Sequence, residues 1–431
     1  MNMESLDIAK PMQTLLRIES LRVEFGPTTS PLVAIDDLSL EIARGETLVL
    51  VGESGSGKSL TALAVTRLLP TAARIVQGRV TLAGKDLFAL PAARMSEVRG
   101  KRIGFVFQEP QVALNPVMRI GDQIGEVLRQ HLGLRGTDLH LRTVEALHAV
   151  GIPDPARRAR DYPHQFSGGM KQRAMIAIAL AGEPELLIAD EPTTALDVTL
   201  QAQILDLLKA EQRRRGMGML FITHDFGVAW QVADRVAVLQ AGSLVESAPR
   251  EQFYRAPRHP YSRALFAALP RLEPRAQIAP PAAAEPLLEV ENLRIEFPIR
   301  RGVFRRTVDC VRAVNGVSLR LAAGETLAIV GESGSGKTTM GRGILRLLPL
   351  AGGSVRFQGE DLATLSAASL RRRRRHLQVV FQDSYAAMNP RMLVDDIIQE
   401  GMIAQHLGAS RAAREARVVD CLLYTSDAAD E

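Results

Sequence analysis

The sequence predicts an α/β fold with a mostly parallel central sheet, and predicts it twice along the chain. Three observations indicate this. A Gly-rich stretch lies between an apolar β-run and a helical pattern, short continuous apolar runs typical of buried parallel strands follow it, and the arrangement recurs in the second half.

The recurrence is direct. VGESGSGKS at Val51–Ser59 returns as VGESGSGKT at Val330–Thr338. The flanking stretches LRVEF, GETL and VFQ…LNP return as LRIEF, GETL and VFQ…MNP, in the same order. The sequence therefore predicts a duplicated domain.

Five prolines in Pro270–Pro286 indicate a semi-rigid linker between the copies. The predicted divisions are a first domain at 14–249, an extension at 250–272, the linker at 273–286, a second domain at 287–420 and a tail at 421–431.

In the first domain, the pattern of each predicted element supports the α/β class. Alternating apolar residues near Leu15 predict strands, and LVLVG before the Gly-rich turn predicts another. A helix is expected from Lys58 to Leu69, closed by Pro70. LLIAD at Leu186–Asp190 and MLFITHD at Met219–Asp225 predict parallel strands buried on both faces.

Composition excludes some classes and leaves others open. A hydrophobic content of 46% is typical of a globular protein. A net charge of +5 does not distinguish nucleic acid, anionic lipid and nucleotide as binding partners. Cys310 and Cys421 are too few for a disulfide framework. The start carries Glu4 and Asp7 rather than a signal peptide, and no apolar run reaches membrane-spanning length, so membrane association is expected only through a partner.

The Gly-rich stretch has the pattern GxxxxGK[ST] between a predicted strand and helix. Its backbone N–H groups would surround phosphate, the lysine would reach the β- and γ-phosphates of ATP, and the hydroxyl would bind Mg²⁺. The expected ATP-binding residues of the first copy are Gly52, Glu53, Ser54, Gly55, Ser56, Gly57, Lys58 and Ser59. Those of the second copy are Gly331, Glu332, Ser333, Gly334, Ser335, Gly336, Lys337, Thr338 and Thr339.

Two adjacent acids end the strand Leu186–Asp190. Charge there is costly unless a cation or polarised water meets it. We expect Asp190 to hold Mg²⁺ through water and Glu191 to orient and deprotonate the attacking water.

With these motifs, the chain resembles the ABC ATPase family of P-loop NTPases, in particular the oligopeptide and dipeptide importer type with two fused nucleotide-binding domains. FSGGMKQR at Phe166–Arg173 resembles the family signature LSGGQ, departing at Phe166 and Met170. The resemblance implies an antiparallel β subdomain and a helical signature subdomain beside the parallel sheet.

The resemblance also implies site roles. Ser167, Gly168, Gly169 and Met170 would clasp the γ-phosphate bound by an opposing domain. Gln108 would sense Mg²⁺ and water, Asp197 would lie in the D-loop, and His224 would contact the γ-phosphate, so that Glu191, His224 and Gln108 form the catalytic set. The implied Mg²⁺ set is Ser59, Gln108, Asp190, Thr338 and Gln382. Phe25 and Phe297 would stack on adenine or belong to the core, and the sequence leaves both open.

Arg250–Pro270 resembles the C-terminal extension of peptide and nickel importer ATPases, with its HPY motif. Some relatives carry cysteines there for an iron–sulfur cluster; this extension has none, so no cluster is expected. The run Arg371–Arg375 lacks an aromatic platform and is expected to be a solvated or membrane-facing surface rather than a nucleic-acid site.

In the first copy the signature follows Gln108 by 59 positions, which places a second signature near 441, beyond residue 431. The second copy is therefore expected to be truncated, and the tail from Cys421 resembles translated sequencing-adapter read-through. Neither ATP site would then be complete within one chain. The chain is therefore expected to bind ATP but barely to hydrolyse it alone, unless two first domains pair between chains.

The resemblance implies a peripheral subunit on the cytoplasmic face of the bacterial inner membrane. Its partners would be two permease subunits and, indirectly, an extracytoplasmic substrate-binding protein. Di- and oligopeptides, glutathione, microcin-like peptides and nickel remain open as cargo. The alternative functions are a twin-cassette translation factor and an inactive remnant; the proline-rich linker favours the importer over the factor, which carries a long charged interdomain helix.

Overall fold

The computed structural model describes residues 13–27, 29–194, 196–269, 286–301, 306–332, 334–382 and 387–430, with backbone alone for 299–301, 306–308 and 425–430. The chain divides into two compact units, Met1–Glu273 and Pro274–Glu431. Among the described residues, no helix combines the length and apolar character needed to cross a membrane.

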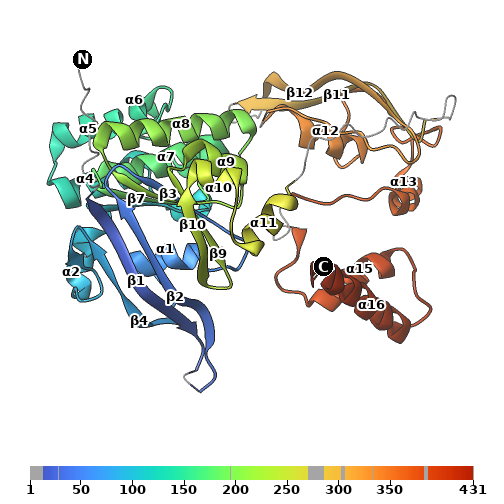
Figure 1. The fold of residues 1–431 in the computed structure, drawn as a ribbon. Helices are drawn as coiled ribbons and strands as arrows, with labels where there is room; N and C mark the ends of the chain where they lie inside the picture. Colours follow the sequence, from blue (N-terminus) through green and yellow to red (C-terminus); the bar gives the residue numbers. More distant parts are fainter. Residues whose placement is uncertain are drawn as a thin grey trace, which may run out of the picture. The chain divides into compact units, whose positions relative to one another are not determined.

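Two sheets build the first unit (Figure 1). Their strands are β1 Thr14–Phe25, β2 Leu32–Ala43, β3 Thr47–Val51, β4 Ala73–Leu82, β5 Lys85–Asp86, β6 Ile103–Val106, β7 Leu186–Asp190, β8 Gly218–Ile222, β9 Arg235–Gln240 and β10 Ser243–Pro249. An antiparallel sheet has the order β2-β1-β4-β5, and a larger sheet has the order β10-β9-β3-β8-β7-β6. In the larger sheet β3, β6, β7, β8 and β9 are parallel, and β10 is antiparallel to β9.

The larger sheet is covered on both faces, because its strands contribute to two hydrophobic clusters. Leu48 and Leu50 of β3 pack with the antiparallel sheet and the first helix, whereas Val49 and Val51 pack with helices on the opposite face. Alternate residues of a strand point to opposite faces, so a run such as TLVLV is buried throughout. The predicted α/β class with its parallel sheet and antiparallel subdomain is confirmed.

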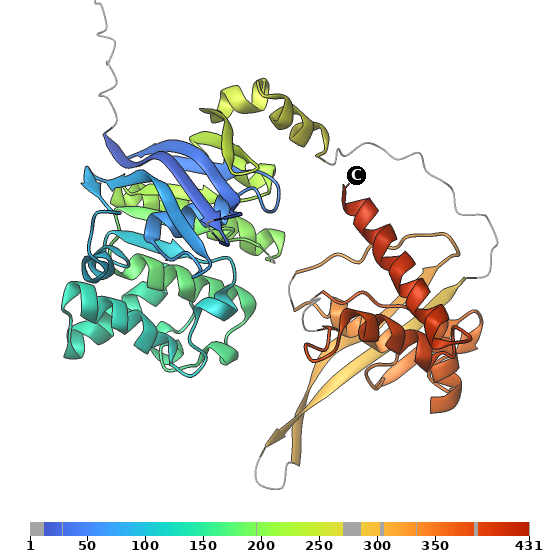
Figure 2. The same cartoon turned by 90° about the horizontal axis from the view of Figure 1, so that it is seen from below.

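Helices surround these sheets, and Figure 2 shows the cyan to green helices of residues 120–181 grouped at one end of the unit. The helices are α1 Lys58–Thr66, α2 Ala92–Val98, α3 Pro110–Ala113, α4 Ile120–Leu132, α5 Gly136–Ala149, α6 Pro155–Arg158, the 3-10 turn η1 Pro163–Gln165, α7 Gly168–Ala181, α8 Val198–Arg215, α9 Phe226–Val232, α10 Arg250–Arg255 and α11 Pro260–Ala267.

Helix α1 is shorter than the sequence predicts. It ends at Thr66, and Arg67 adopts a left-handed conformation with φ 53°. The N–H groups of Arg67 and Leu68 donate back to the carbonyl oxygens of Ala64 and Leu63. The expected end at Leu69 was wrong because these capping bonds close the helix before Pro70 acts.

The second unit contains an antiparallel sheet of order β12-β11-β13-β14, with packed helices. Its elements are β11 Leu288–Arg301, β12 Arg306–Leu321, α12 Lys337–Ile344, β13 Gly352–Phe357, β14 Glu360–Asp361, α13 Ala367–Arg373, the 3-10 turn η2 Arg374–His376, α15 Val394–Ala404 and α16 Arg411–Asp430. Its buried core is small, with Val290, Leu293, Ile295, Val314, Met340, Val355, Phe357 and Leu362.

The expectation that both copies share a strand before the phosphate loop was wrong for the second unit. Residues 326–332 form no strand there, and Leu327, Ile329 and Val330 are 42%, 46% and 91% exposed. In the first unit the matching strand β3 lies between β8 and β9, which both follow the loop by more than 150 residues. Within the described part of the second unit no strand takes their place, so this apolar segment stays outside a sheet.

Two other predicted regions can be located. Arg371–Arg375 lies in α13 and η2, mostly exposed, with Arg373 paired to Glu360. Cys421 lies within α16, which continues past the predicted start of the tail. Most of the predicted linker at 273–286 lies outside the described residues.

Candidate active site

The first phosphate loop connects β3 to α1. Gly57 adopts φ 100° and ψ 2° immediately before the helix, a backbone conformation that favours glycine. Lys58 is buried at 6% exposure, and its Nζ donates to the carbonyl oxygens of Gly52 at 2.8 Å and Glu53 at 2.7 Å. Burial lowers the pKa of Lys58. The ammonium group therefore lies in the curve of the loop.

Gly52 allows the loop to approach the sheet. A Cβ at this position would lie 2.3 Å from the carbonyl oxygen of Leu239 in β9 and 2.8 Å from Ser56 Oγ. Only glycine fits so close to a neighbouring backbone. Strand β9 thus fixes where the loop begins.

Asp190 ends β7 directly beside the loop. Its carboxylate is buried at 6% exposure and accepts a hydrogen bond from Ser59 Oγ at 3.0 Å. Burial raises the pKa of Asp190 to about 6, helped by the charge of Glu191, while Ser59 and Lys58 act in the opposite direction. A buried carboxylate with a raised pKa is stabilised by a cation.

The donor set around Asp190 fits Mg²⁺. Ser59 and Asp190 offer hard oxygen ligands 3.0 Å apart, which suits a metal bound by few protein groups and by phosphate oxygens. No cluster of three or more His, Cys, Asp or Glu side chains arranged as metal ligands occurs in the described parts of the chain. The protein alone therefore provides a partial metal site, of the kind that nucleotide phosphates complete.

Three side chains converge on the carboxylate of Glu191. Gln108 Nε2 donates to Oε2 at 3.0 Å, Thr194 Oγ1 donates to the same oxygen at 2.8 Å, and His224 Nδ1 lies 3.1 Å from Oε1. Burial opposes ionisation of Glu191, but the bonds from His224 and Thr194 outweigh it, so that its pKa lies below the ordinary value. The carboxylate is held ionised and oriented.

The backbone of Glu191 is strained. Its φ is 45°, in the left-handed region that a residue with a side chain rarely adopts, and its N–H donates to the carbonyl oxygen of Ile222 in β8. Such strain persists where surrounding bonds impose it and is common at functional sites. The hydrogen bond to strand β8 therefore helps to orient the Glu191 side chain.

These groups face one cavity of about 730 Å³. Its lining includes Phe25, residues of the phosphate loop, Gln108, Glu191, Thr194 and His224. The structure thus brings together residues that the sequence spreads over 200 positions. Phe25 lines the cavity, whereas its counterpart Phe297 lies on β11 with 42% exposure.

The signature segment does not line this cavity. Ser167 is the N-cap of α7, where its hydroxyl accepts the N–H of Met170 at 3.3 Å. Gly169 has a packing role as well, because a Cβ there would lie 2.1 Å from Leu200 Cδ2. Asp197 similarly caps α8, accepting the N–H of Leu200, and Ala195 before it lies outside the described residues.

The second loop repeats the local geometry of the first. Gly336 adopts φ 96° and ψ 2°, and Lys337 Nζ donates to the carbonyl oxygens of Gly331 at 2.6 Å and Glu332 at 2.7 Å. Thr338 and Gln382 are both exposed. Ser333 lies outside the described residues.

Sequence reasoning missed two polar contacts of the first site. Thr194 binds Glu191, as described above, and the Tyr261 hydroxyl oxygen accepts the N–H of Glu53 at 3.3 Å. Thr194 lies only three positions after Glu191, and a loop that turns back brings residues at this spacing together. The sequence could therefore have suggested this contact. Tyr261 gave no local signal, because 208 positions separate it from Glu53.

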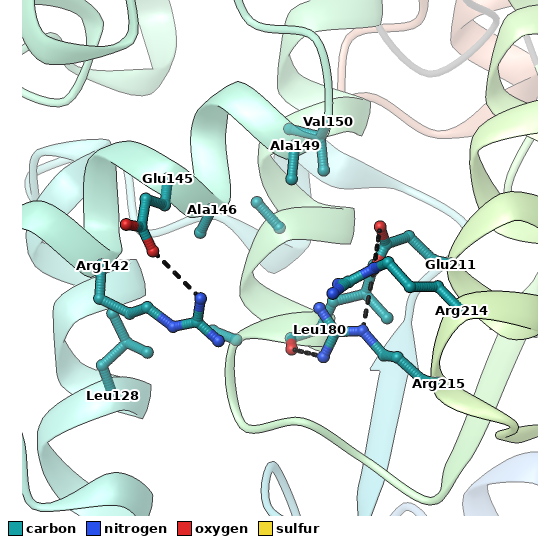
Figure 3. Close-up of a pocket in the computed structure, with 12 residues that line it drawn as sticks. Leu128, Arg142, Glu145, Ala146, Ala149, Val150, Leu180, Glu211, Arg214 and Arg215 are labelled. Carbon is teal, nitrogen blue, oxygen red and sulfur yellow. Dashed lines mark hydrogen bonds and ion pairs between the residues drawn. The ribbon is translucent and has the colours of Figure 1, made fainter.

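A second, smaller cavity lies among α4, α5, α7 and α8 (Figure 3). Its volume is about 50 Å³, and ion pairs of Arg142 with Glu145 and of Arg214 and Arg215 with Glu211 flank it. Arg215 also donates to the carbonyl oxygen of Leu180 at 3.0 Å. A cavity of this size is far too small for a nucleotide.

Comparison with known proteins identifies the family. The family model described as ABC transporter matches residues 35–194 and 314–426, together more than half of the chain. The model described as Oligopeptide/dipeptide transporter, C-terminal region matches residues 245–293. The second ABC transporter match reaches residue 426, inside the segment predicted to be a tail.

The chain is 45% identical over 411 residues to the Peptidoglycan transport ATP-binding protein YejF of Agrobacterium fabrum, covering 95% of this chain and 74% of the relative. It is 44% identical over 437 residues to the Glutathione import ATP-binding protein GsiA of Escherichia coli K12, covering 94% and 70%. A solved dimeric ATP-binding cassette with ADP and Pi is 28% identical, with a TM-score of 0.49, over 55% of this chain and 99% of that one.

The transporter-specific match at 245–293 does not favour the translation-factor alternative. From the two family matches and the curated relatives, the chain belongs to the ABC transporter family of ATPases, among the ATP-binding proteins of the oligopeptide, dipeptide and glutathione import type.

Proposed function

We propose that this chain hydrolyses ATP at the cavity of its first unit and so drives uptake of di- or oligopeptides, glutathione included, through membrane permease subunits. The observation that carries the proposal is the convergence of Gln108, Thr194 and His224 on the Glu191 carboxylate at the wall of the phosphate-loop cavity. The oligopeptide/dipeptide match at 245–293 and the named activities of the relatives support the cargo class.

Each residue of the first site has a proposed role that follows from its position around the phosphate loop. Lys58 leaves its loop carbonyls to bind the β- and γ-phosphates, and the loop N–H groups and the start of α1 bind phosphate oxygens. Ser59 and Asp190 would hold Mg²⁺, with Gln108 beside them. When bound, the metal neutralises charge on the phosphate oxygens.

Glu191 is the proposed general base. Its ionised carboxylate would accept a proton from the attacking water, and His224, which contacts the same carboxylate, is the proposed partner of the γ-phosphate. Oε2 accepts two hydrogen bonds, whereas among the described side chains Oε1 contacts only His224, so Oε1 keeps a lone pair for the attacking water.

The signature segment Ser167–Met170 lies outside its own cavity, and we propose that a second copy of the first unit completes the site from another chain. Turnover per chain is then expected to rise with protein concentration, because two first units must meet. A turnover per chain that is high and independent of concentration in a monomeric preparation would argue against this pairing.

The importer role is tested in proteoliposomes containing the chain with its permease subunits and binding protein. We expect ATP-dependent accumulation of labelled dipeptide or glutathione, and its loss in the Lys58→Ala variant. Labelled nickel serves as the competing cargo. Hydrolysis without uptake of either peptide would refute the cargo class while leaving the ATPase assignment intact.

A further inference from the structure

The oligopeptide-type extension contacts the phosphate loop of the first unit. Tyr261, in the HPY motif at the start of α11, accepts the backbone N–H of Glu53 with its hydroxyl oxygen at 3.3 Å. Glu53 is the second residue of the loop motif. A segment that follows the whole nucleotide-binding domain in sequence thus binds the loop directly.

This bond and a bond from Lys58 hold the same peptide group. The carbonyl of Gly52 and the N–H of Glu53 belong to one planar amide. Lys58 Nζ donates to that carbonyl at 2.8 Å, and Tyr261 accepts from that N–H at 3.3 Å. The orientation of this amide therefore depends on both side chains, and with it the position from which Lys58 reaches phosphate.

The extension is anchored firmly enough to act as a support. Both carboxylate oxygens of Glu246 in β10 accept backbone N–H groups, of Arg258 at 2.8 Å and of His259 at 3.0 Å. His259 Nδ1 then accepts the N–H of Tyr261 at 3.2 Å, as the N-cap of α11. This chain of bonds fixes the backbone from which the Tyr261 ring projects.

Aromatic packing fastens the same extension to α9, the helix that begins two residues after His224. Phe266 of α11 lies 5.1 Å from Phe226 of α9 and 5.4 Å from Phe253 of α10, measured between ring centroids. The Tyr254 hydroxyl donates to the carbonyl oxygen of Phe226. The extension is therefore attached to the sheet and to α9 independently of Tyr261.

We propose that Tyr261 is a positioning residue for nucleotide binding, through which the extension sets the affinity of the first phosphate loop for ATP. The proposal rests on the proposed function, since it requires ATP to bind at this loop. Tyr261 acts through the Gly52–Glu53 amide and not on the γ-phosphate. It is expected to change affinity, because preorganisation lowers the cost of binding, and to leave the chemical step alone.

The test is Tyr261→Phe in the full chain, which keeps the ring and removes the hydroxyl. One neutral hydrogen bond corresponds to roughly a three- to tenfold change in affinity, so the Kd for ATP by titration calorimetry and the KM are expected to rise by about that factor, with kcat retained. Hydrogen exchange in a peptide containing the Glu53 amide is expected to accelerate.

Tyr254→Phe is the matched control, because it removes a hydroxyl from the same extension without a bond to the loop. Trp230, the single tryptophan of the chain, lies 4.9 Å from the Tyr254 ring and reports whether α10 stays docked. We expect unchanged Trp230 emission in Tyr261→Phe, and the affinity of Tyr254→Phe for ATP to stay within twofold of wild type, on the order of measurement scatter.

The outcomes separate this proposal from the proposed function. If wild type binds ATP but Tyr261→Phe has the same Kd and the same Glu53 exchange, the positioning role is refuted and the ATPase proposal stands. Equal weakening by both tyrosine variants would also refute it, by showing general loosening. A wild-type chain that binds no ATP would overturn both.

Discussion

The two phosphate loops share a backbone conformation and differ in what surrounds them. The glycines before α1 and α12 adopt φ 100° and 96°, and Lys58 and Lys337 bond to matching carbonyls. Yet β3 is buried at every position in a six-stranded sheet, whereas Val330 at the matching place is 91% exposed. The loop is therefore encoded by its own residues, and the strand before it depends on distant partners.

The difference extends to catalysis. In the first unit, Asp190 ends β7, Glu191 follows it and His224 follows β8; β8 pairs directly with β3, and β7 pairs with β8. The same pairing that buries the strand thus delivers the acids and the histidine to the loop.

The largest expected effect comes from equivalent valines in the two VFQ motifs. Val106 in β6 is fully buried, whereas Val380 is 98% exposed. We expect Val106→Asp to cost more than about 4 kcal/mol in free energy of unfolding, because it buries an unpaired charge, and Val380→Asp to cost less than about 0.5 kcal/mol.

Urea unfolding followed by far-UV circular dichroism, with Trp230 fluorescence for the first unit, measures both. Equal destabilisation by the two substitutions would show that Val380 is packed in solution. The two VFQ segments would then not differ in burial, contrary to the comparison of the two units.

Packing within the helical part of the first unit gives a smaller effect. A Cβ on Gly169 would lie 2.1 Å from Leu200 Cδ2, whereas one on Gly168 meets nothing within 4 Å. Gly169→Ala is expected to cost about 1 kcal/mol, because the half-buried Leu200 side chain must turn aside, and Gly168→Ala to be neutral or slightly stabilising. Similar unfolding midpoints for both variants would mean that α7 and Leu200 adjust freely, and that packing does not require glycine in the signature.

The anchor of the extension gives an effect of comparable size that depends on pH. Burial opposes ionisation of Glu246, and hydrogen bonds including the N–H groups of Arg258 and His259 outweigh it, so its pKa lies below the ordinary 4.5. A lowered folded pKa means that the stabilisation is complete above about pH 4.5 and is lost as the pH falls through the folded value.

Glu246→Gln is therefore expected to lower the free energy of unfolding by about 1.5 kcal/mol at pH 7 and to lose less than wild type on acidification. Glu97→Gln, which removes an exposed pair with Arg94, is the control and is expected to cost under about 0.5 kcal/mol. Trp230 emission during unfolding measures all three proteins; identical pH profiles for wild type and Glu246→Gln would contradict this anchor.

The sequence was sufficient where the structure is local or strongly patterned. The loop glycines, the buried strand β7 and the acids that follow it could all be predicted, because an apolar run and a motif each determine their own conformation. The sequence was insufficient where contacts between distant segments determine the local structure. The strand expected before Lys337 does not form, because the described part of the second unit supplies no neighbouring strands, and the contact of Tyr261 with Glu53 joins residues 208 positions apart. The early end of α1 has a local cause, the backbone capping bonds at Arg67, for which the sequence carries no glycine signal.

Glu191, held by its backbone bond to β8 and oriented by Gln108, Thr194 and His224, is the proposed base of the first ATP site. Glu191→Gln preserves shape and removes the proton acceptor. In calorimetry and phosphate-release assays on the full chain, we expect the ATP Kd of this variant to stay within about twofold of wild type and its hydrolysis to fall by about 100-fold or more. Hydrolysis at the wild-type rate would contradict this role of Glu191.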